Sequence, residues 1–166
     1  MQGINVAGQE ISLVLPLTDF AKAYDGPTTD PKEFELQQKK LQDELQFVHD
    51  FGGRLIVTGA YTSAGATLDD RVRAFVAEMQ PHVARAEELG VTIAVENHSS
   101  SLLDTPDAVR CFAEHAKSER LGVALAPYHL PQDPQALAQL IDDLGRKLVH
   151  FYAWEHGHGA MDKLPK

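Results

Sequence analysis

The sequence predicts an α/β protein built on a parallel sheet, and three observations support this prediction. Short apolar segments alternate with amphipathic segments of helical spacing about five times along the chain. The links between them are short, as βα units require. Residues 91–95 are apolar without polar alternation, which is typical of a strand buried on both faces. Because βα crossovers share one handedness, a barrel and a doubly wound sheet are the main choices.

Five strands and four helices are expected. The strands are expected at residues 11–15, 55–58, 91–95, 121–126 and 147–153. Residues 18–30 read as a loop, and the helices are expected at residues 31–51, 68–89, 106–116 and 134–144.

Capping residues define the helix ends. Thr67 or Asp69 is expected to cap the second helix. Thr105 and Asp133 each precede a proline, which favours the first turn of a helix. Pro81 lies inside the second helix and predicts a kink or a split there.

Composition excludes several classes of protein. The 166 residues are enough for one domain with a core, and the net charge of −9 argues against a nucleic-acid partner. Cys111 is the one cysteine, so no internal disulfide is expected and a reducing compartment is favoured. The sequence shows no secretory signal and no apolar run long enough for a membrane, so a cytoplasmic location is expected.

Polar and aromatic side chains follow three consecutive predicted strands. Because ligands bind at the carboxyl ends of such strands, these residues are the candidate site. A carboxylate placed there can move a proton, and Glu and His together can hold a divalent metal. The residues are Glu96, Asn97 and His98 after the third strand, Tyr128 and His129 after the fourth, and Tyr152, Trp154, Glu155 and His156 at the end of the fifth.

Simpler explanations exist for each residue alone. Glu96 could be the first solvated residue of a loop, and His98 could cap the following turn. His129 could pack under Tyr128, and histidines flanked by glycine, such as His156, often bind metal only adventitiously. Nucleotide motifs are missing: no G-x-G-x-x-G fingerprint follows a strand, and residues 59–65 lack the lysine of a P-loop.

Four motifs in order resemble the sugar isomerase/epimerase superfamily with a xylose-isomerase-like TIM barrel. They are GVTIAVENH, LLDTPD, LGVALAPYH and KLVHFYAWE, and the resemblance extends over most of the chain from Ile11. It implies a (β/α)8 barrel that interconverts or epimerises sugars, usually with a bound divalent metal such as Mn, Mg or Zn.

The resemblance also implies roles for individual residues. Glu96 matches a glutamate that binds metal and exchanges a proton with substrate, and His129 matches a substrate-binding histidine. Ala126 stands where the family has an aspartate ligand, and Tyr152 replaces the second histidine of a His-x-His motif that begins at His150. Alanine cannot ligate, so the sequence departs from the family at two metal positions.

These arguments give one set of expected sites. Glu96 and His129 are the expected catalytic residues, and Glu96 and His156 the expected metal ligands. Substrate binding is expected from Asn97, His98, Tyr128, Tyr152, Trp154 and Glu155.

Length adds an expectation about completeness. A TIM barrel typically needs about 250 residues, so residues 1–166 are expected to form a single domain that is a partial barrel of about five βα units, truncated at both ends. The alternative is a homo-oligomer in which a partner chain covers the exposed edge strands. Two functions follow: an isomerase or epimerase of a small polyhydroxy carbonyl compound, or a non-catalytic carbohydrate-binding or scaffold protein with a degraded metal site.

Overall fold

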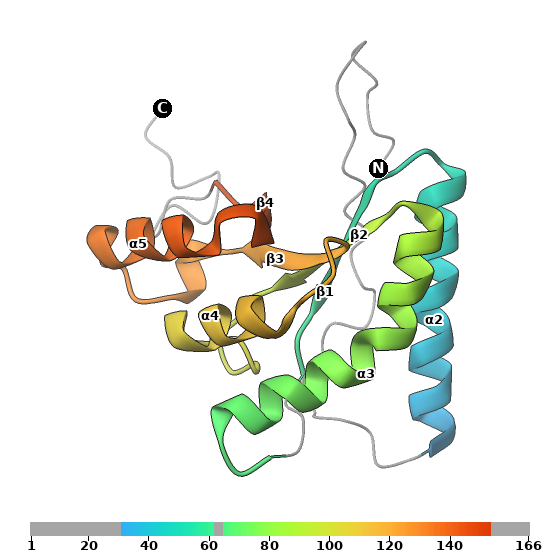
Figure 1. Cartoon of the computed structure of the whole chain (residues 1–166), viewed down its shortest axis with the longest axis horizontal. Helices are drawn as coiled ribbons and strands as arrows, with labels where there is room; N and C mark the ends of the chain where they lie inside the picture. Colours follow the sequence, from blue (N-terminus) through green and yellow to red (C-terminus); the bar gives the residue numbers. More distant parts are fainter. Residues whose placement is uncertain (1–30, 62–64, 154–166) are drawn as a thin grey trace, which may run out of the picture.

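The computed structural model describes residues 31–61 and 65–153, and these residues form alternating helices and strands (Figure 1). The strand expected at residues 11–15, the loop at 18–30, and Trp154, Glu155 and His156 lie outside the described residues. The elements are α2 (Pro31–Asp50), β1 (Leu55–Gly59), α3 (Leu68–Leu89), β2 (Thr92–Glu96), α4 (Pro106–His115), β3 (Leu121–Leu125), the 3-10 turn η1 (Pro127–His129), α5 (Pro134–Leu144), the 3-10 turn η2 (Gly145–Lys147) and β4 (Leu148–Phe151).

The four described strands form one parallel sheet in the order β1-β2-β3-β4. Each strand therefore lies beside its neighbour in the sequence, as the alternation of βα units predicts. Consecutive helices pack against one another outside the sheet, α2 on α3, α3 on α4 and α4 on α5 (Figure 1). This arrangement confirms the α/β class and is consistent with part of a βα barrel.

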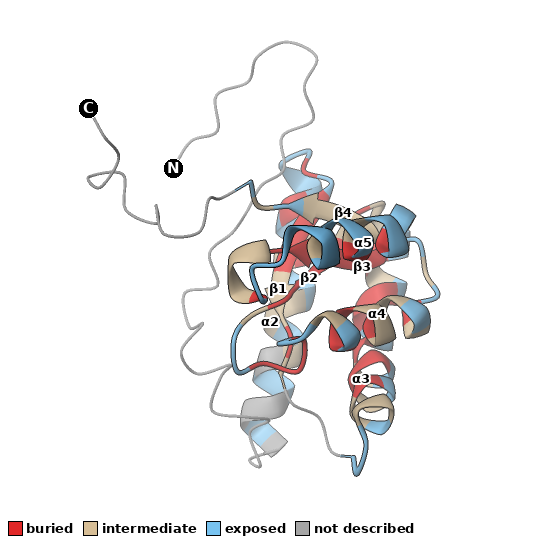
Figure 2. Cartoon of the chain, turned by 90° about the vertical axis from the view of Figure 1, so that its left-hand side faces the viewer, coloured by how far each residue is buried: buried red, intermediate tan, exposed pale blue. Residues whose placement is uncertain are grey.

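The two faces of the sheet have different surroundings. One face packs against the helices and forms the main core, in which Ile93 and Val123 join the buried rings Phe75 and Phe112. The other, which we call the inner face, is made of smaller side chains that form a second buried cluster. That cluster comprises Leu55, Val57, Ala94 and Ala124, with Val149 and Tyr152 packed against it. The ribbons of β2 and β3 are coloured as buried along most of their length (Figure 2).

Helix α3 begins and ends where the sequence predicts. Thr67 is the N-cap and forms a capping box with Asp70, and Gly90 ends the helix in the left-handed conformation at φ 67°. Pro81 does not split α3, which stays one element of 22 residues, although its ribbon bends along its course (Figure 1). A missing N–H removes one helical hydrogen bond, and the packed residues on both sides of Pro81 hold the helix together.

Strands β3 and β4 approach each other closely at Gly122. A Cβ atom there would lie 2.7 Å from Val149 Cγ1 and 2.8 Å from the Lys147 carbonyl oxygen. The missing side chain thus lets β4 lie against β3, which brings Tyr152 beside the end of β2.

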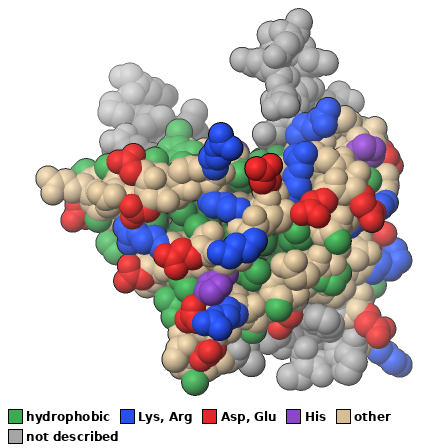
Figure 3. Space-filling model, viewed as in Figure 1, with side chains coloured by type: hydrophobic (Ala, Val, Ile, Leu, Met, Phe, Trp, Pro, Cys, Tyr) green, Lys and Arg blue, Asp and Glu red, His purple; other side chains and the backbone are tan. Residues whose placement is uncertain are grey.

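The surface of the helical layer is charged and mixed in sign. Lys and Arg side chains are interspersed with Asp and Glu over the face shown in Figure 3. Among the described residues, no helix combines the length and the apolar character that crossing a membrane requires.

Candidate functional site

Glu96 is the last residue of β2 and lies at the carboxyl end of the sheet, as predicted. It pairs in register with Gly59 of β1 and Ala124 of β3, and only 8% of its surface is exposed. Strand alternation puts it on the same face as Ala94, which is the inner face. The carboxylate therefore points away from the helices, where a ligand of a βα barrel would bind.

The Tyr152 hydroxyl donates a hydrogen bond of 3.0 Å to Glu96 Oε2. Burial raises the pKa of Glu96 above its usual value, while this hydrogen bond and the nearby His98 oppose the rise. Burial and the Glu96 carboxylate also raise the pKa of Tyr152, so its hydroxyl keeps its proton at neutral pH. The pair is thus a buried carboxyl group with one fixed hydrogen-bond donor, whose pKa is raised by burial.

Two histidines meet at the ends of β2 and β3. The rings of His98 and His129 have centroids 3.8 Å apart, and Ser99 Oγ lies 3.2 Å from His129 Nδ1. His98 Nδ1 donates to the Ser99 carbonyl oxygen at 2.9 Å, since a carbonyl can only accept. Burial and the neighbouring His98 lower the pKa of His129, which favours its neutral form.

Aromatic rings link the three strand ends into one continuous set. Tyr128 lies 4.3 Å from His129 and 6.5 Å from Tyr152 between ring centroids, and its ring is nearly perpendicular to that of Tyr152. His150 packs edge-on against Tyr152 at 4.7 Å. Glu96, His98, Tyr128, His129, His150 and Tyr152 form this set, which we call the strand-end cluster. The structure thus brings together five of the predicted site residues, and Tyr152 is central to them.

Asn97 lies within the protein rather than in the open site. It is fully buried, and its side chain exchanges two hydrogen bonds with the backbone of Ala126. Nδ2 donates to the Ala126 carbonyl oxygen at 3.0 Å, and Oδ1 accepts from the Ala126 N–H at 2.6 Å. Both ends of the amide are therefore used, so we place Asn97 as a positioning residue that holds the end of β3 against the end of β2.

The strand-end cluster does not fit the metal that the family implies. Ala126 is fully buried and offers a methyl group at an expected ligand position, and Glu96 Oε2 accepts from Tyr152. Within the described residues, one group of three Asp, Glu, His or Cys side chains is close enough to share an ion, and it lies elsewhere, at Asp69, Cys111 and His115.

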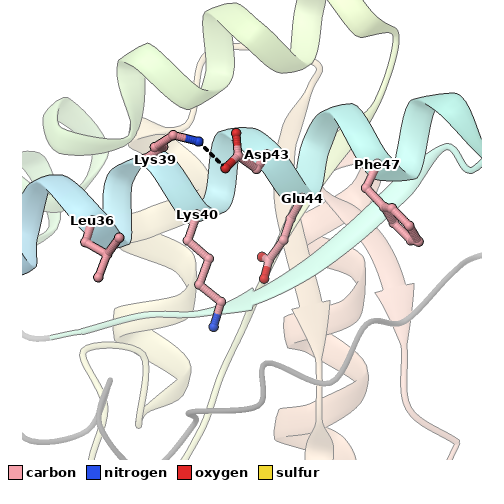
Figure 4. A pocket seen from close by; sticks show the side chains of 6 residues that line it. All are labelled: Leu36, Lys39, Lys40, Asp43, Glu44 and Phe47. Carbon is pink, nitrogen blue, oxygen red and sulfur yellow. Dashed lines mark hydrogen bonds and ion pairs between the residues drawn. The ribbon is translucent and has the colours of Figure 1, made fainter.

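A hollow of about 600 Å³ lies along α2 (Figure 4). The described residues that line it all lie on α2, and none belongs to the strand-end cluster. The lining residues are Leu36, Lys39, Lys40, Asp43, Glu44 and Phe47.

Sequence reasoning missed two groups of polar residues in the helical layer. His82 is buried, with Nε2 in contact with Gln38 Oε1, and His115 contacts Asp69 across 46 residues of sequence. The spacing of Cys111 and His115 by four residues places both on one helix face and was the one available signal. Asp69 lies on another helix, and no local pattern links it to them.

The fold and the strand-end cluster together define part of a βα barrel with a polar site at the carboxyl ends of its strands. The chain belongs to the xylose isomerase-like TIM barrel family, whose model matches residues 5–160. It matches no curated protein sequence.

Several solved structures share the fold at low sequence identity. The Escherichia coli 3-keto-D-glucoside 4-epimerase YcjR superposes with a TM-score of 0.65 at 16% identity, covering 82% of this chain and 59% of its own. The Clostridium cellulolyticum H10 D-psicose 3-epimerase with D-tagatose superposes with a TM-score of 0.62 at 19% identity, and the match covers 78% of this chain and 48% of the epimerase. The IolI protein with a bound zinc atom superposes with a TM-score of 0.61 at 16% identity, and the match covers 75% of this chain and 46% of IolI. The chain thus spans about half the length of these structures.

Proposed function

We propose that the strand-end cluster binds a small polyhydroxy carbonyl compound, a sugar or sugar phosphate, and that Glu96 exchanges a proton at the carbon beside the carbonyl group. The hydrogen bond from Tyr152 to the buried Glu96 is the observation that supports this most directly. Membership of the family and the sugar epimerases among the structural neighbours agree with it.

The chemistry needs a carboxyl group whose pKa lies closer to neutrality than usual. Burial raises the pKa of Glu96 in that direction. His98 and His129 present ring nitrogens beside it that can bind sugar hydroxyls, and His129 can stabilise an enediolate oxygen by donating a proton in a hydrogen bond. The rings of Tyr128 and Tyr152 provide the apolar wall against which a sugar face packs. Trp154 and Glu155, the next residues along the chain, are proposed to complete the substrate contacts.

A second function, binding without turnover, is favoured by Ala126 and Tyr152. Both stand at positions where the family resemblance implies metal ligands, and Tyr152 instead bonds to the Glu96 carboxylate. Under this second function, the 166-residue chain binds manganese and magnesium weakly at this site and does not turn over a sugar. In that case sugar binding persists because the hydrogen-bonding and aromatic groups remain.

Binding and proton exchange can be measured separately on the full chain. Calorimetry with a panel of ketoses and aldoses measures binding, and exchange of solvent deuterium into the bound sugar measures proton transfer. We expect at least one sugar to bind, and we expect His129→Ala to weaken that binding. Deuterium exchange that disappears in Glu96→Gln would establish proton transfer, whereas binding without exchange would support the second function.

Glu78→Gln is the matched control, because Glu78 also accepts a hydrogen bond from a tyrosine hydroxyl, at 2.6 Å from Tyr61, but lies on α3. This variant should bind sugar as the unchanged chain does. Failure of every sugar to bind would overturn the proposal. Micromolar binding of manganese or magnesium with turnover lost in Glu96→Gln would overturn the weak-metal proposal.

A further inference from the structure

Three side chains with metal-binding atoms meet on the outside of the sheet, between α3 and α4. They are Asp69, Cys111 and His115, and one ligand atom from each lies within 4.8 Å of the other two. His115 Nε2 is 2.6 Å from Asp69 Oδ1, and Cys111 Sγ is 3.9 Å from the same oxygen. This group belongs to the helical layer and has no residue in common with the strand-end cluster.

The fold holds these three residues in place independently of any ion. Cys111 and His115 are four residues apart on α4, so both project from one face of that helix, which packs against α3. Asp69 lies in the first turn of α3, two residues after the Thr67 cap. Arg73 forms an ion pair with Asp69 Oδ2, which leaves Oδ1 directed toward the cysteine and the histidine.

The three ligand atoms are close enough to surround a tetrahedral ion after a small movement. Bonds of about 2.0 Å to nitrogen or oxygen and about 2.3 Å to sulfur imply ligand atoms roughly 3.3–3.7 Å apart. The Cys111–Asp69 distance of 3.9 Å is close to this range, and the His115–Asp69 hydrogen bond at 2.6 Å needs to open by about 0.7 Å. All three residues are partly exposed, so an ion can enter from solvent and keep a water as its fourth ligand.

We propose that Asp69, Cys111 and His115 form a three-ligand site for a zinc-class divalent cation that ties α3 to α4. Thiolate, imidazole and carboxylate together select zinc or cobalt over magnesium and calcium, which prefer oxygen ligands alone. On binding, the Cys111 thiol releases its proton to solvent as the metal–sulfur bond forms. His115 Nε2 releases to solvent the proton that it donates to Asp69 Oδ1. The ring then holds its one remaining proton on Nδ1, by exchange with solvent, and the Nε2 lone pair binds the ion. The site is structural, and it does not depend on the proposed sugar site.

Cobalt(II) titration of the full chain tests this site specifically. A bound thiolate gives a sulfur-to-cobalt charge-transfer absorption in the near ultraviolet, and Cys111 is the one cysteine in the sequence. We expect that band to saturate at one cobalt per chain and to disappear when zinc is added in competition. Cys111→Ser should abolish it, and Asp69→Asn and His115→Gln should each weaken cobalt binding at least about tenfold.

His49→Gln is the matched control, because His49 is another helical histidine, exposed on a different part of the surface, whose Nδ1 bonds to the Leu89 carbonyl oxygen. It should leave the band unchanged. Alkylation of Cys111 in the unchanged chain gives a second readout that needs no variant, and zinc should slow it at least about tenfold. Absence of the band at millimolar cobalt, a band that persists unchanged in both Asp69→Asn and His115→Gln, or alkylation unaffected by zinc would overturn the proposal.

Discussion

The Tyr152 hydroxyl and the Glu96 carboxylate are joined by a hydrogen bond of 3.0 Å across 56 residues of sequence. Glu96 ends β2 and Tyr152 follows β4, so the bond crosses over β3, where Ala124 offers only a methyl group on the inner face. A larger residue at that point would separate the two side chains. The family resemblance implies a metal ligand at position 152, and here the residue is a hydrogen-bond donor to the carboxylate instead.

Tyr152→Phe is expected to raise the pKa of Glu96 further. The hydrogen bond from Tyr152 lowers that pKa against the effect of burial, and phenylalanine cannot donate. Loss of the bond should also reduce the free energy of unfolding by about 1–3 kcal/mol at neutral pH. Carbon NMR of the Glu96 carboxyl group as a function of pH measures the first effect, and denaturant unfolding measures the second.

Tyr61→Phe is the control for that variant, because it removes the equivalent 2.6 Å hydrogen bond to Glu78 on α3. It should reduce stability by a similar amount and leave the Glu96 titration unchanged. A Glu96 pKa that stayed constant in Tyr152→Phe would contradict the role given to Tyr152.

Glu96→Gln is expected to change how stability depends on pH. Burial raises the pKa of Glu96 above 4.5, so the folded chain keeps this proton at pH values where the unfolded chain has released it. The free energy of unfolding of the unchanged chain should therefore fall as pH rises from about 4.5 through the folded-state pKa. The variant should lose this decrease and be at least as stable at neutral pH. Urea unfolding at a series of pH values measures this effect, and Glu78→Gln is measured alongside as the control. If the unfolding free energies of Glu96→Gln and the unchanged chain changed in parallel with pH, the prediction would be contradicted.

His82 should make the chain less stable in acid. The side chain is 1% exposed, its Nε2 bonds to Gln38 Oε1, and its buried Nδ1 has no hydrogen-bond partner among the described residues. Burial lowers the pKa of His82 below 6.5, so the unfolded chain takes up a proton first as pH falls. Stability should decline below about pH 6.5, and His82→Leu should remove that decline at a cost of about 1 kcal/mol at neutral pH.

The check for His82 is thermal unfolding from neutral to mildly acidic pH. His49→Leu serves as the control, since His49 lies on the surface and its change should not alter the acid response. The same acid decline in His82→Leu would show that another group is responsible.

Asn97→Ala should disturb the end of β3 more than a typical polar substitution. It would leave the N–H and the carbonyl group of the fully buried Ala126 without the partners they have at 2.6 Å and 3.0 Å. Two unsatisfied buried groups cost about 1–3 kcal/mol each, so a loss of roughly 2–6 kcal/mol is expected. Gln139→Ala, which removes an exposed hydrogen bond to Asp143, should change stability by under about 1 kcal/mol in the same denaturant experiment. A loss of unfolding free energy under about 1 kcal/mol in Asn97→Ala would show that Asn97 does not position β3.

The sequence alone predicted the helices and strands of residues 31–61 and 65–153 and their order. Thr67 was one of two expected caps, and Thr105 and Asp133 were expected at helix starts because each precedes a proline. All three side chains accept backbone N–H hydrogen bonds as N-caps. These features depend on residues within one or two turns of each other, so the local pattern contains the information. The placement of Glu96 at the carboxyl end of a buried strand followed from the same reasoning.

Only the tertiary structure decided which of these residues meet. Tyr152 and Glu96 are 56 residues apart, Asn97 and Ala126 are 29 apart, and His115 and Asp69 are 46 apart. Each contact depends on strand register, on the close approach of β3 and β4, or on how α3 packs on α4, and a one-residue slip in a strand would turn its side chains to the other face. Such long-range pairings are set by the packing of the whole core, which no local pattern in the sequence specifies.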